Sequence, residues 1–285
     1  MLDRRLSLPQ EWLTDEACAE RRLACGIPAA TTFRTKQALA LEMMQAVVQD
    51  GTLRCRWVTA DEAFGRDTAF LEGVTGCGLW YCAAVPHDTR GWLERPATVV
   101  PEGVGRGRTP THPRLAAQAP AAQTVAALAA HLPPEAWQPH LIKEGSQGPL
   151  LADCACLRVV AVRDSLPGPD VWLVLRRPPE TGELTTYLSA APGDTQVETL
   201  VRISGMRWPI ETCCEDRKQW LGMGDYAGRS WTGWHQHLTL VILAHFFVVR
   251  TMFTMKKTPR PCPSRNPCCS WPPFCPSWSL IHGWR

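Results

Sequence analysis

An arginine, a carboxylate and a lysine follow one another at short intervals toward the C-terminal end of the chain. Arg207, Glu211 and Lys218 are spaced as R-x3-E-x6-K. Proline is tolerated in the first turn of a helix, so a helix that begins near Pro209 would place Glu211 and Lys218 on one face. A carboxylate flanked by cations suits a divalent metal ion with phosphate oxygens beside it. An ordinary solvated helix face with a Glu/Lys pair has the same spacing, so both interpretations stay open.

A second carboxylate follows a short apolar segment earlier in the chain. Residues 56–60 predict a strand that ends at Asp61, and residues 78–85 predict the next strand. In open α/β sheets, functional groups gather outside the carboxyl ends of the strands, which is where this prediction places Asp61. The alternative is that Asp61 only caps a helix or a turn.

Both segments resemble parts of one known family, the insertion-sequence transposases of the DDE type. The stretch around Glu211 is similar to the glutamate region of these enzymes, whose signature is Y-(2)-R-(3)-E-(6)-K, with Ser204 at the tyrosine position. Residues 56–65 resemble the strand that carries the second catalytic aspartate, and residues 220–240 also match the family pattern. The resemblance covers roughly residues 1–257.

The resemblance implies an α/β chain with an RNase H-like catalytic domain, interrupted by a β-rich insertion. It implies that Asp61 and Glu211 are catalytic residues that bind Mg²⁺ or Mn²⁺. Arg207, Lys218 and Trp208 are the residues expected to contact phosphate or DNA. The expected partners are transposon ends, target DNA and a second copy of the chain in a homodimer.

The first catalytic aspartate of the family has no clear counterpart. Asp3, Asp15 and Asp50 precede Asp61, but none follows an apolar strand of the required kind. We therefore expect a chain that is truncated at its N-terminus, incomplete in its RNase H-like fold and inactive as an enzyme. The alternatives are a remnant that binds DNA or a full-length transposase without cutting, and a metal-dependent nuclease that does not join strands.

Composition limits the protein class without deciding it. The chain has 285 residues, and 30 basic against 27 acidic side chains give a net charge of +3, which permits nucleic-acid binding without requiring it. No N-terminal segment has the pattern of a secretory signal. The apolar run 238–253 is shorter than the roughly 20 residues of a membrane span. It predicts a buried helix, and we expect a cytoplasmic, nucleoid-associated protein without membrane contact, whose thirteen cysteines are reduced and mostly buried.

Helical and strand patterns divide the chain into four parts. A helix is predicted over 35–49, ending at Asp50-Gly51, and a shorter one over 124–131. Three predicted strands of the insertion cover 157–162, 171–176 and 185–188. The predicted domains are 1–92 for the first catalytic part, 93–193 for the β-rich insertion, 194–257 for the helical catalytic part, and 258–285 for a Pro/Cys-rich tail, disordered or frameshifted.

Three further features of the sequence lead to predictions. The Pro/Gly-rich loop 96–120 contains Arg106, Arg108 and Arg114, which either contact DNA or are only solvated. Asp194 is expected to cap a helix over 195–204. The Trp and His residues of 231–237 favour packing or DNA contact over a metal site, because H-x-H on a helix points in two directions.

Overall fold

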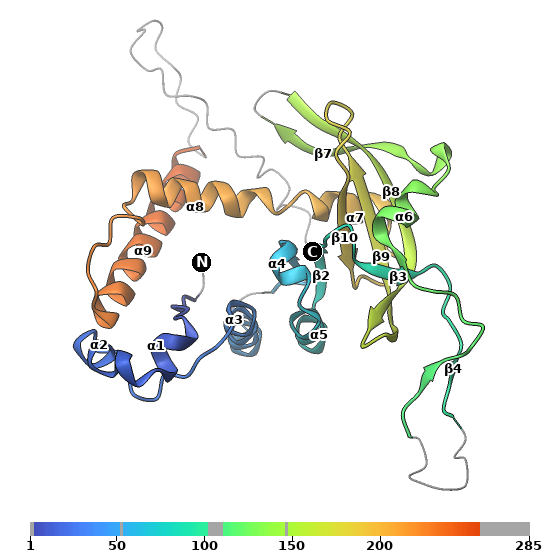
Figure 1. Ribbon diagram of the computed structural model, residues 1–285. Coiled ribbons are helices and arrows are strands. Elements are labelled where there is room, and N and C mark those ends of the chain that lie inside the picture. The colour runs from blue at the N-terminus through green and yellow to red at the C-terminus, as the bar shows by residue number, and fades with distance from the viewer. Residues whose placement is uncertain (1–2, 52–53, 102–110, 146–147, 257–285) are drawn as a thin grey trace, which may run out of the picture. The chain divides into compact units, whose positions relative to one another are not determined.

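The computed structural model describes residues 3–51, 54–101, 111–145 and 148–256. Its contacts divide the chain into two compact units, which are described separately (Figure 1). The helical unit comprises Met1–Thr52 and Trp208–Arg285, and the sheet unit comprises Leu53–Arg207. Arg106, Arg108 and the predicted tail 258–285 lie outside the described residues.

The sheet unit is built on one mixed sheet. Its strands are β1 (Trp57–Ala60), β2 (Trp80–Ala84), β3 (Arg90–Trp92), β6 (Gln123–Thr124), β7 (Gln138–Gly145), β8 (Gly148–Arg163), β9 (Leu166–Arg177) and β10 (Thr185–Ser189). In the described residues the strand order is β1-β2-β10-β9-β8-β3-β6, with β7 also paired to β8. A separate pair is formed by β4 (Thr98–Val99) and β5 (Arg114–Leu115). The α/β prediction is confirmed.

The β1–β2 pair is parallel, whereas the other pairs of the described sheet are antiparallel. Ala60 pairs with Ala83, so Asp61 follows the carboxyl end of β1 as predicted. Strand β2 then pairs with β10, and this joins the first strands to those of the predicted insertion. The predicted domain boundaries at 92/93 and 193/194 consequently fall inside one compact unit.

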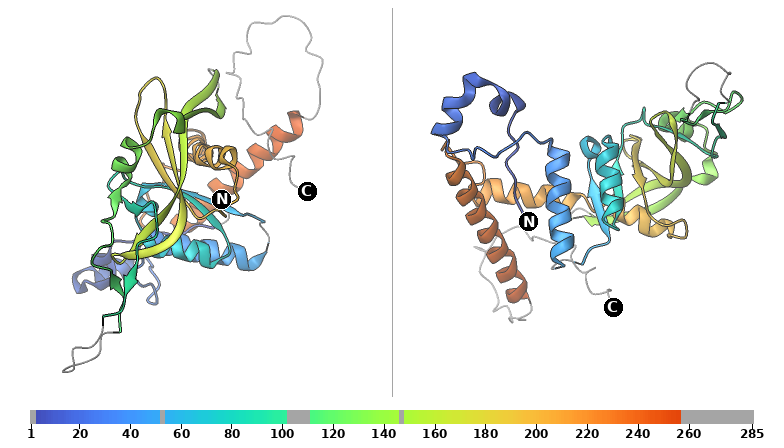
Figure 2. Two further views of the ribbon diagram at one scale, coloured as in Figure 1. Left: turned by 90° about the vertical axis from the view of Figure 1, so that its right-hand side faces the viewer. Right: turned by 90° about the horizontal axis from the view of Figure 1, so that it is seen from below.

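The longest strands form the β8–β9 hairpin, which curves through the sheet unit in both views of Figure 2. They exceed the predicted strands because prolines at 149, 167 and 169 are accommodated within them. The hairpin turns at Asp164 and Ser165, whose φ angles are +48° and +65°. Positive φ at both central residues is typical of the tight hairpin turns whose twist matches that of the strands.

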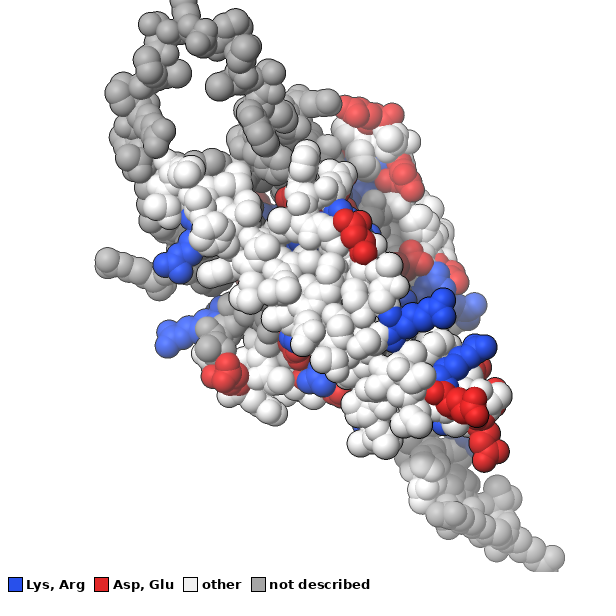
Figure 3. All heavy atoms as spheres, turned by 90° about the vertical axis from the view of Figure 1, so that its left-hand side faces the viewer, with Lys and Arg blue, Asp and Glu red and all other residues white. Residues whose placement is uncertain are grey.

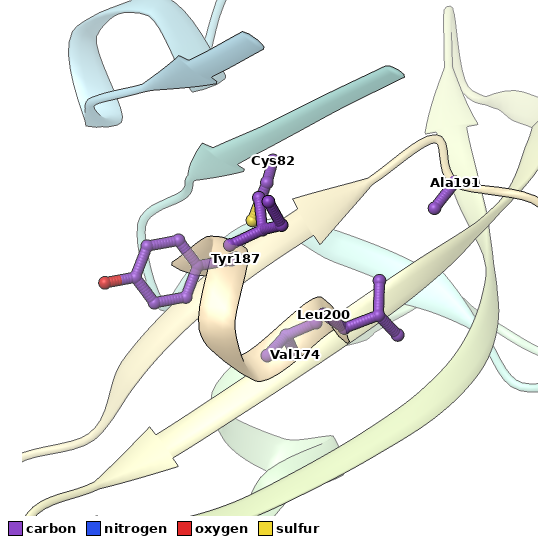
Figure 4. Packing of buried hydrophobic residues seen from close by; sticks show 6 residues of the cluster. Cys82, Val174, Tyr187, Ala191 and Leu200 are labelled. Carbon is purple, nitrogen blue, oxygen red and sulfur yellow. The ribbon is translucent and has the colours of Figure 1, made fainter. Parts of the chain in front are cut away.

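Helices complete the core of the sheet unit. They are α4 (Glu62–Gly65), α5 (Thr68–Gly76), α6 (Val125–Ala130) and α7 (Val197–Ser204), with a 3₁₀ turn η2 (Pro134–Ala136). Leu200 of α7 packs in a buried cluster with Val174 of β9 and Cys82 of β2 (Figure 4). Asp194 does not cap α7, because residues 192–195 form a turn and the helix begins later, at Val197 after Gln196.

The helical unit contains α1 (Gln10–Thr14), η1 (Glu16–Cys18), α2 (Ala19–Ala24), α3 (Lys36–Asp50), α8 (Trp208–Trp220) and α9 (Trp231–Lys256). The predicted helix 35–49 is α3, capped by the Thr35 side chain and ended by Gly51 in the left-handed conformation. The predicted helix around Glu211 is α8, with Pro209 in its first turn.

The prediction that residues 238–253 form a buried helix is wrong. Leu238 and Val241 of α9 are buried, but Leu240 is 67% exposed and Phe247 is 69% exposed. Figure 3 shows one face of the molecule, on which side chains without charge form a broad area. The apolar helix is also longer than predicted, since Trp231–Met255 has the length and mean hydropathy to cross a membrane. Absence of membrane contact stays a prediction.

The cysteines of the described residues are all free, as predicted, but only Cys82 and Cys154 are buried. Burial raises the pKa of Cys82 to about 12 and that of Cys154 to about 11. These two thiols therefore remain protonated at neutral pH and act as small apolar side chains.

Candidate active site

Asp61 caps the short helix α4 at the end of the parallel strand pair. Its Oδ1 accepts a hydrogen bond from the backbone N–H of Phe64 at 3.3 Å, and the residue is exposed. Gly65, at the end of α4, packs so closely on β2 that a Cβ there would collide with the Ala84 carbonyl oxygen. This close contact fixes the position of α4 and of Asp61. The capping interpretation is confirmed, and the catalytic role stays a prediction.

Two arginines lie near Tyr187, at the end of the sheet where Asp61 is found. It pairs with Ala84 at the carboxyl end of β2, and the Arg176 guanidinium lies 5.5 Å from the centre of its ring. Burial raises the pKa of Tyr187, while the positive charges of Arg176 and Arg207 oppose that rise. In Figure 4 the Tyr187 ring carries its hydroxyl away from the Cys82–Leu200 cluster. The phenol is therefore protonated at neutral pH and lies near two cations.

Ser204 stands where the family signature has tyrosine, and its role here is structural. The residue is 4% exposed, and its hydroxyl donates to the Val201 carbonyl oxygen at 2.7 Å. Arg176 Nη1 donates to the Ser204 carbonyl oxygen at 3.2 Å and to its Oγ at 3.3 Å. Ser204 thus anchors Arg176 at the C-terminal end of α7.

Glu211 and Lys218 lie on α8 of the helical unit, where both are exposed. Seven residues separate them, so they project from one side of the helix. Trp208 is the first residue of α8. The structure therefore places Asp61 and Arg207 in the sheet unit, and Trp208, Glu211 and Lys218 in the helical unit.

A buried arginine holds another side of α8. Arg217 is 2% exposed, and its Nη2 lies 2.9 Å from Cys213 Sγ and 3.4 Å from His245 Nδ1 of α9. Burial raises the pKa of the Cys213 thiol and lowers that of His245, with Arg217 lowering the latter further. Both neighbours are therefore neutral near pH 7, and this contact turns Arg217 inward.

The two histidines of the H-x-H motif have different surroundings. His235 lies between the rings of Trp231 and Trp234, whose centres are 4.7 and 4.8 Å from its own. His237 Nε2 instead lies 3.0 Å from the Gly222 carbonyl oxygen. Packing, one of the two roles favoured for this motif, explains the positions of both side chains.

A family model for DDE superfamily endonucleases matches residues 1–149, which is more than half of the chain. The chain belongs to the DDE superfamily endonucleases. The matched stretch contains Asp61 and both strands of the parallel pair. No curated protein matches the chain. Glu211 and the other candidate residues of α8 lie beyond the matched residues, so their roles still rest on the resemblance.

Endonucleases of this superfamily typically use divalent metal ions, and their substrate is DNA. The described residues contain no group of three or more His, Cys, Asp and Glu side chains that could hold a metal ion. Asp61 fits one position in such a site, because it is an exposed carboxylate at a strand end and Mg²⁺ prefers oxygen ligands. Glu211, the second exposed carboxylate, has the same donor chemistry.

Sequence reasoning missed Arg176 and Tyr187 of this DDE endonuclease. The two residues come from β9 and β10, more than a hundred positions after Asp61 in the sequence. Only the pairing of β10 with β2 places Tyr187 at the carboxyl end of the parallel strands. The alternation of Trp172, Val174 and Arg176 along β9 was the available signal, since these side chains share one face of the sheet.

Proposed function

We propose that this chain is a transposase of the YREK-signature group, whose chemistry is the cleavage of DNA at transposon ends and the joining of those ends to target DNA by two-metal phosphoryl transfer. The expectation that the chain itself is inactive rests on the first catalytic aspartate, which has no clear counterpart before Asp61, and the cleavage assay described below tests it. The observation that carries the proposal is the position of Asp61, directly after a parallel strand and inside the family match. Functional groups of open α/β sheets gather at such strand ends.

In this proposal Asp61 and Glu211 supply carboxylate oxygens to Mg²⁺ or Mn²⁺. Ions held by these carboxylates would supply activation of the attacking hydroxyl and stabilisation of the leaving oxygen of the phosphodiester. Arg207 and Lys218 pair with phosphate oxygens, and Trp208 contacts the DNA end. The charge of Arg207 lies near the Tyr187 ring, at the same end of the sheet as Asp61. Synapsis of two ends by a homodimer belongs to the same proposal.

Cleavage assays with isosteric variants test the two carboxylates. The purified chain is incubated with Mg²⁺ or Mn²⁺ and duplex DNA from the borders of its own locus. Loss of an outer-shell partner of a metal ligand already costs roughly 10- to 100-fold in activity, so Asp61→Asn and Glu211→Gln should each cost at least about 100-fold. The matched control Asp67→Asn alters an aspartate that caps α5 through the Phe70 N–H at 3.0 Å, and should leave cleavage unchanged.

The second control, Glu215→Gln, removes an exposed carboxylate of α8 that accepts a hydrogen bond from Gln219. Cleavage that survives Asp61→Asn would overturn the assignment of that residue. Cleavage without strand joining would instead identify a plain metal-dependent nuclease.

A second candidate function is DNA binding without cleavage. Arginine guanidinium groups lie over tryptophan rings at Arg177–Trp137, with 4.3 Å to the ring centre, and at Arg158–Trp172, with 5.3 Å. Cation and ring together suit contacts with phosphates and bases of DNA. Binding that persists after Asp61→Asn, needs no metal and weakens steeply with salt, in a chain that never cuts, would favour this function.

A further inference from the structure

A cavity of about 210 Å³ lies within the helical unit, between the N-terminal segment and the start of α9. Its walls include aromatic and aliphatic side chains, among them Leu8, Trp12, Ile27, Tyr226, Trp231 and Trp234. The three tryptophans and the tyrosine are all partly exposed, so their rings are accessible from the cavity. The walls therefore offer flat, largely uncharged surfaces to a ligand.

Hydrogen bonds fix these walls in place. The Trp231 N–H donates to the Cys25 carbonyl oxygen at 2.8 Å, which ties α9 to the N-terminal segment. Arg22 Nη1 donates to the Trp12 carbonyl oxygen at 2.8 Å, and the Tyr226 hydroxyl donates to the Ser230 carbonyl oxygen at 2.9 Å. A cavity with fixed walls binds a rigid ligand with little loss of conformational freedom.

Glycines make room for the Tyr226 ring. A Cβ on Gly228 would lie 2.7 Å from the Tyr226 hydroxyl oxygen, and one on Gly233 would lie 2.6 Å from it. On its other side the ring lies 5.4 Å from the His237 ring, centre to centre. These contacts hold the Tyr226 ring in place where it lines the cavity.

Positive charges border the cavity. Arg229 lines it and is exposed. Arg4 Nε donates to the His235 carbonyl oxygen at 3.2 Å, which places this guanidinium beside the residue between Trp231 and Trp234. Asp3, a nearby carboxylate, accepts a hydrogen bond from the Arg4 backbone N–H at 2.7 Å and pairs with Arg5 at 3.3 Å. Arg4 and Arg229 thus place two guanidinium groups at the border of the cavity.

We propose that this cavity binds an unpaired nucleobase of a DNA strand. The base stacks on the aromatic walls, and Arg229 and Arg4 contact the flanking phosphates. Aromatic stacking with adjacent arginines is the general chemistry of single-stranded nucleic-acid sites. A paired base does not expose its face, so the site selects single-stranded or locally opened DNA. The choice of DNA as the ligand rests on the family and on the function proposed above.

The test measures binding of fluorescent oligonucleotides to the full chain in EDTA, where no cleavage occurs. One probe is single-stranded DNA, and the second has the same length and charge but abasic sugars throughout. Stacking on one aromatic site should make the first probe bind roughly tenfold more tightly than the second. Equal affinity for the two probes would overturn the proposal.

Matched variants test whether the preference for the base-bearing probe arises at this cavity. Trp231→Leu should abolish the preference for the base-bearing probe, whereas Trp220→Leu, which alters a 70% exposed tryptophan of α8 outside the cavity, should keep it. Arg229→Gln should weaken binding of both probes, and Arg21→Gln on the exposed surface of α2 should not. A preference that survives Trp231→Leu would contradict the assignment.

A competition experiment on the unaltered chain does not depend on whether Trp231→Leu folds. Deoxyadenosine monophosphate should displace the base-bearing probe, and deoxyribose phosphate at the same concentration should not. Equal displacement by both would overturn the proposal. Asp61→Asn should leave the base preference unchanged, so failure of this site and failure of the proposed cleavage are separate outcomes.

Discussion

The two units of this endonuclease differ in how they bury apolar side chains. In the sheet unit, Leu173, Val174 and Leu200 are completely buried, and Val174 of β9 packs against Leu200 of α7. In the helical unit, α9 exposes Leu240 and Phe247 by more than half of their surface. Large exposed apolar surfaces mark sites of contact with other molecules. The sheet unit has a core of its own, whereas the helical unit leaves its longest helix largely uncovered.

This difference extends to the candidate catalytic residues. Asp61 follows a sheet strand, and the close packing of Gly65 on β2 fixes its position. Glu211 and Lys218 lie on the exposed side of α8, whose inward contacts centre on Arg217. One carboxylate is therefore preorganised by a packed core, and the other depends on a less well packed unit.

Truncation of one leucine in each unit should show the greatest difference in stability. Leu200→Ala should cost about 2–5 kcal/mol of unfolding free energy, because it empties a fully buried site. Leu240→Ala, in α9, should change stability by no more than about 0.5 kcal/mol. Amide hydrogen exchange in β9 and β10 measures the first effect and exchange in α9 the second. Equal losses would contradict the difference between the units.

Two glycines of the sheet unit test how tightly Asp61 is positioned. Gly65→Ala should cost roughly 1–3 kcal/mol, because its Cβ would collide with the Ala84 carbonyl oxygen and displace α4. Gly76→Ala, at the end of α5, has open space and should stabilise the unit by roughly 0.4–1 kcal/mol. Thermal unfolding of both variants measures the two changes in stability. A neutral Gly65→Ala would show that α4 is not fixed by this contact.

The capping role of Asp61 can be separated from its proposed catalytic role. Asp61→Ala should destabilise the sheet unit by about 1 kcal/mol, because α4 loses its side-chain cap. Asp61→Asn keeps a capping oxygen and should leave stability nearly unchanged. Urea unfolding of the two variants tests whether Asp61→Ala is the less stable of the two. If Asp61→Asn were as destabilising as Asp61→Ala, lost cleavage in that variant would not report on chemistry.

The smallest expected effect is a loss of stability of the helical unit at acid pH. Burial lowers the pKa of His235 below 6.5, Arg4 and Arg5 lower it further, and Asp3 opposes them. The unfolded chain then binds more protons than the folded chain, so this stability is complete above about pH 6.5 and falls as the pH drops through the folded pKa. His235→Gln should flatten the pH dependence of unfolding. An unchanged pH profile would contradict the assignment to His235.

The sequence predicted those elements whose local signals agree with their packing. Residues 36–50 have strong helix formers, a threonine cap and a terminal glycine, and they form α3. The apolar strand before Asp61 and the proline in the first turn of α8 were equally clear. In these segments local preference and tertiary structure favour the same conformation, so pattern reasoning succeeds.

The remaining features depend on contacts between distant segments. The pairing of β10 with β2, which brings Tyr187 to the end of the parallel strands, leaves no mark on local sequence. The prediction of a buried α9 was wrong for a related reason. Apolar composition indicates that burial of a helix would be favourable, but it does not show whether another segment covers the helix. Trp231 and Trp234 were predicted to pack or to contact DNA, but the cavity that they line together with Trp12 could be found only from the structure.

The main proposal to test is that Asp61 and Glu211 each supply carboxylate oxygens to bound metal ions. The most direct measurement replaces Mg²⁺ by Fe²⁺ in the full chain bound to DNA, generates hydroxyl radicals with peroxide, and maps the backbone cuts by mass spectrometry. We expect cuts near both residues, which are lost in Asp61→Asn and retained in Asp67→Asn. Cuts near one residue alone, or cuts that persist in Asp61→Asn, would contradict it.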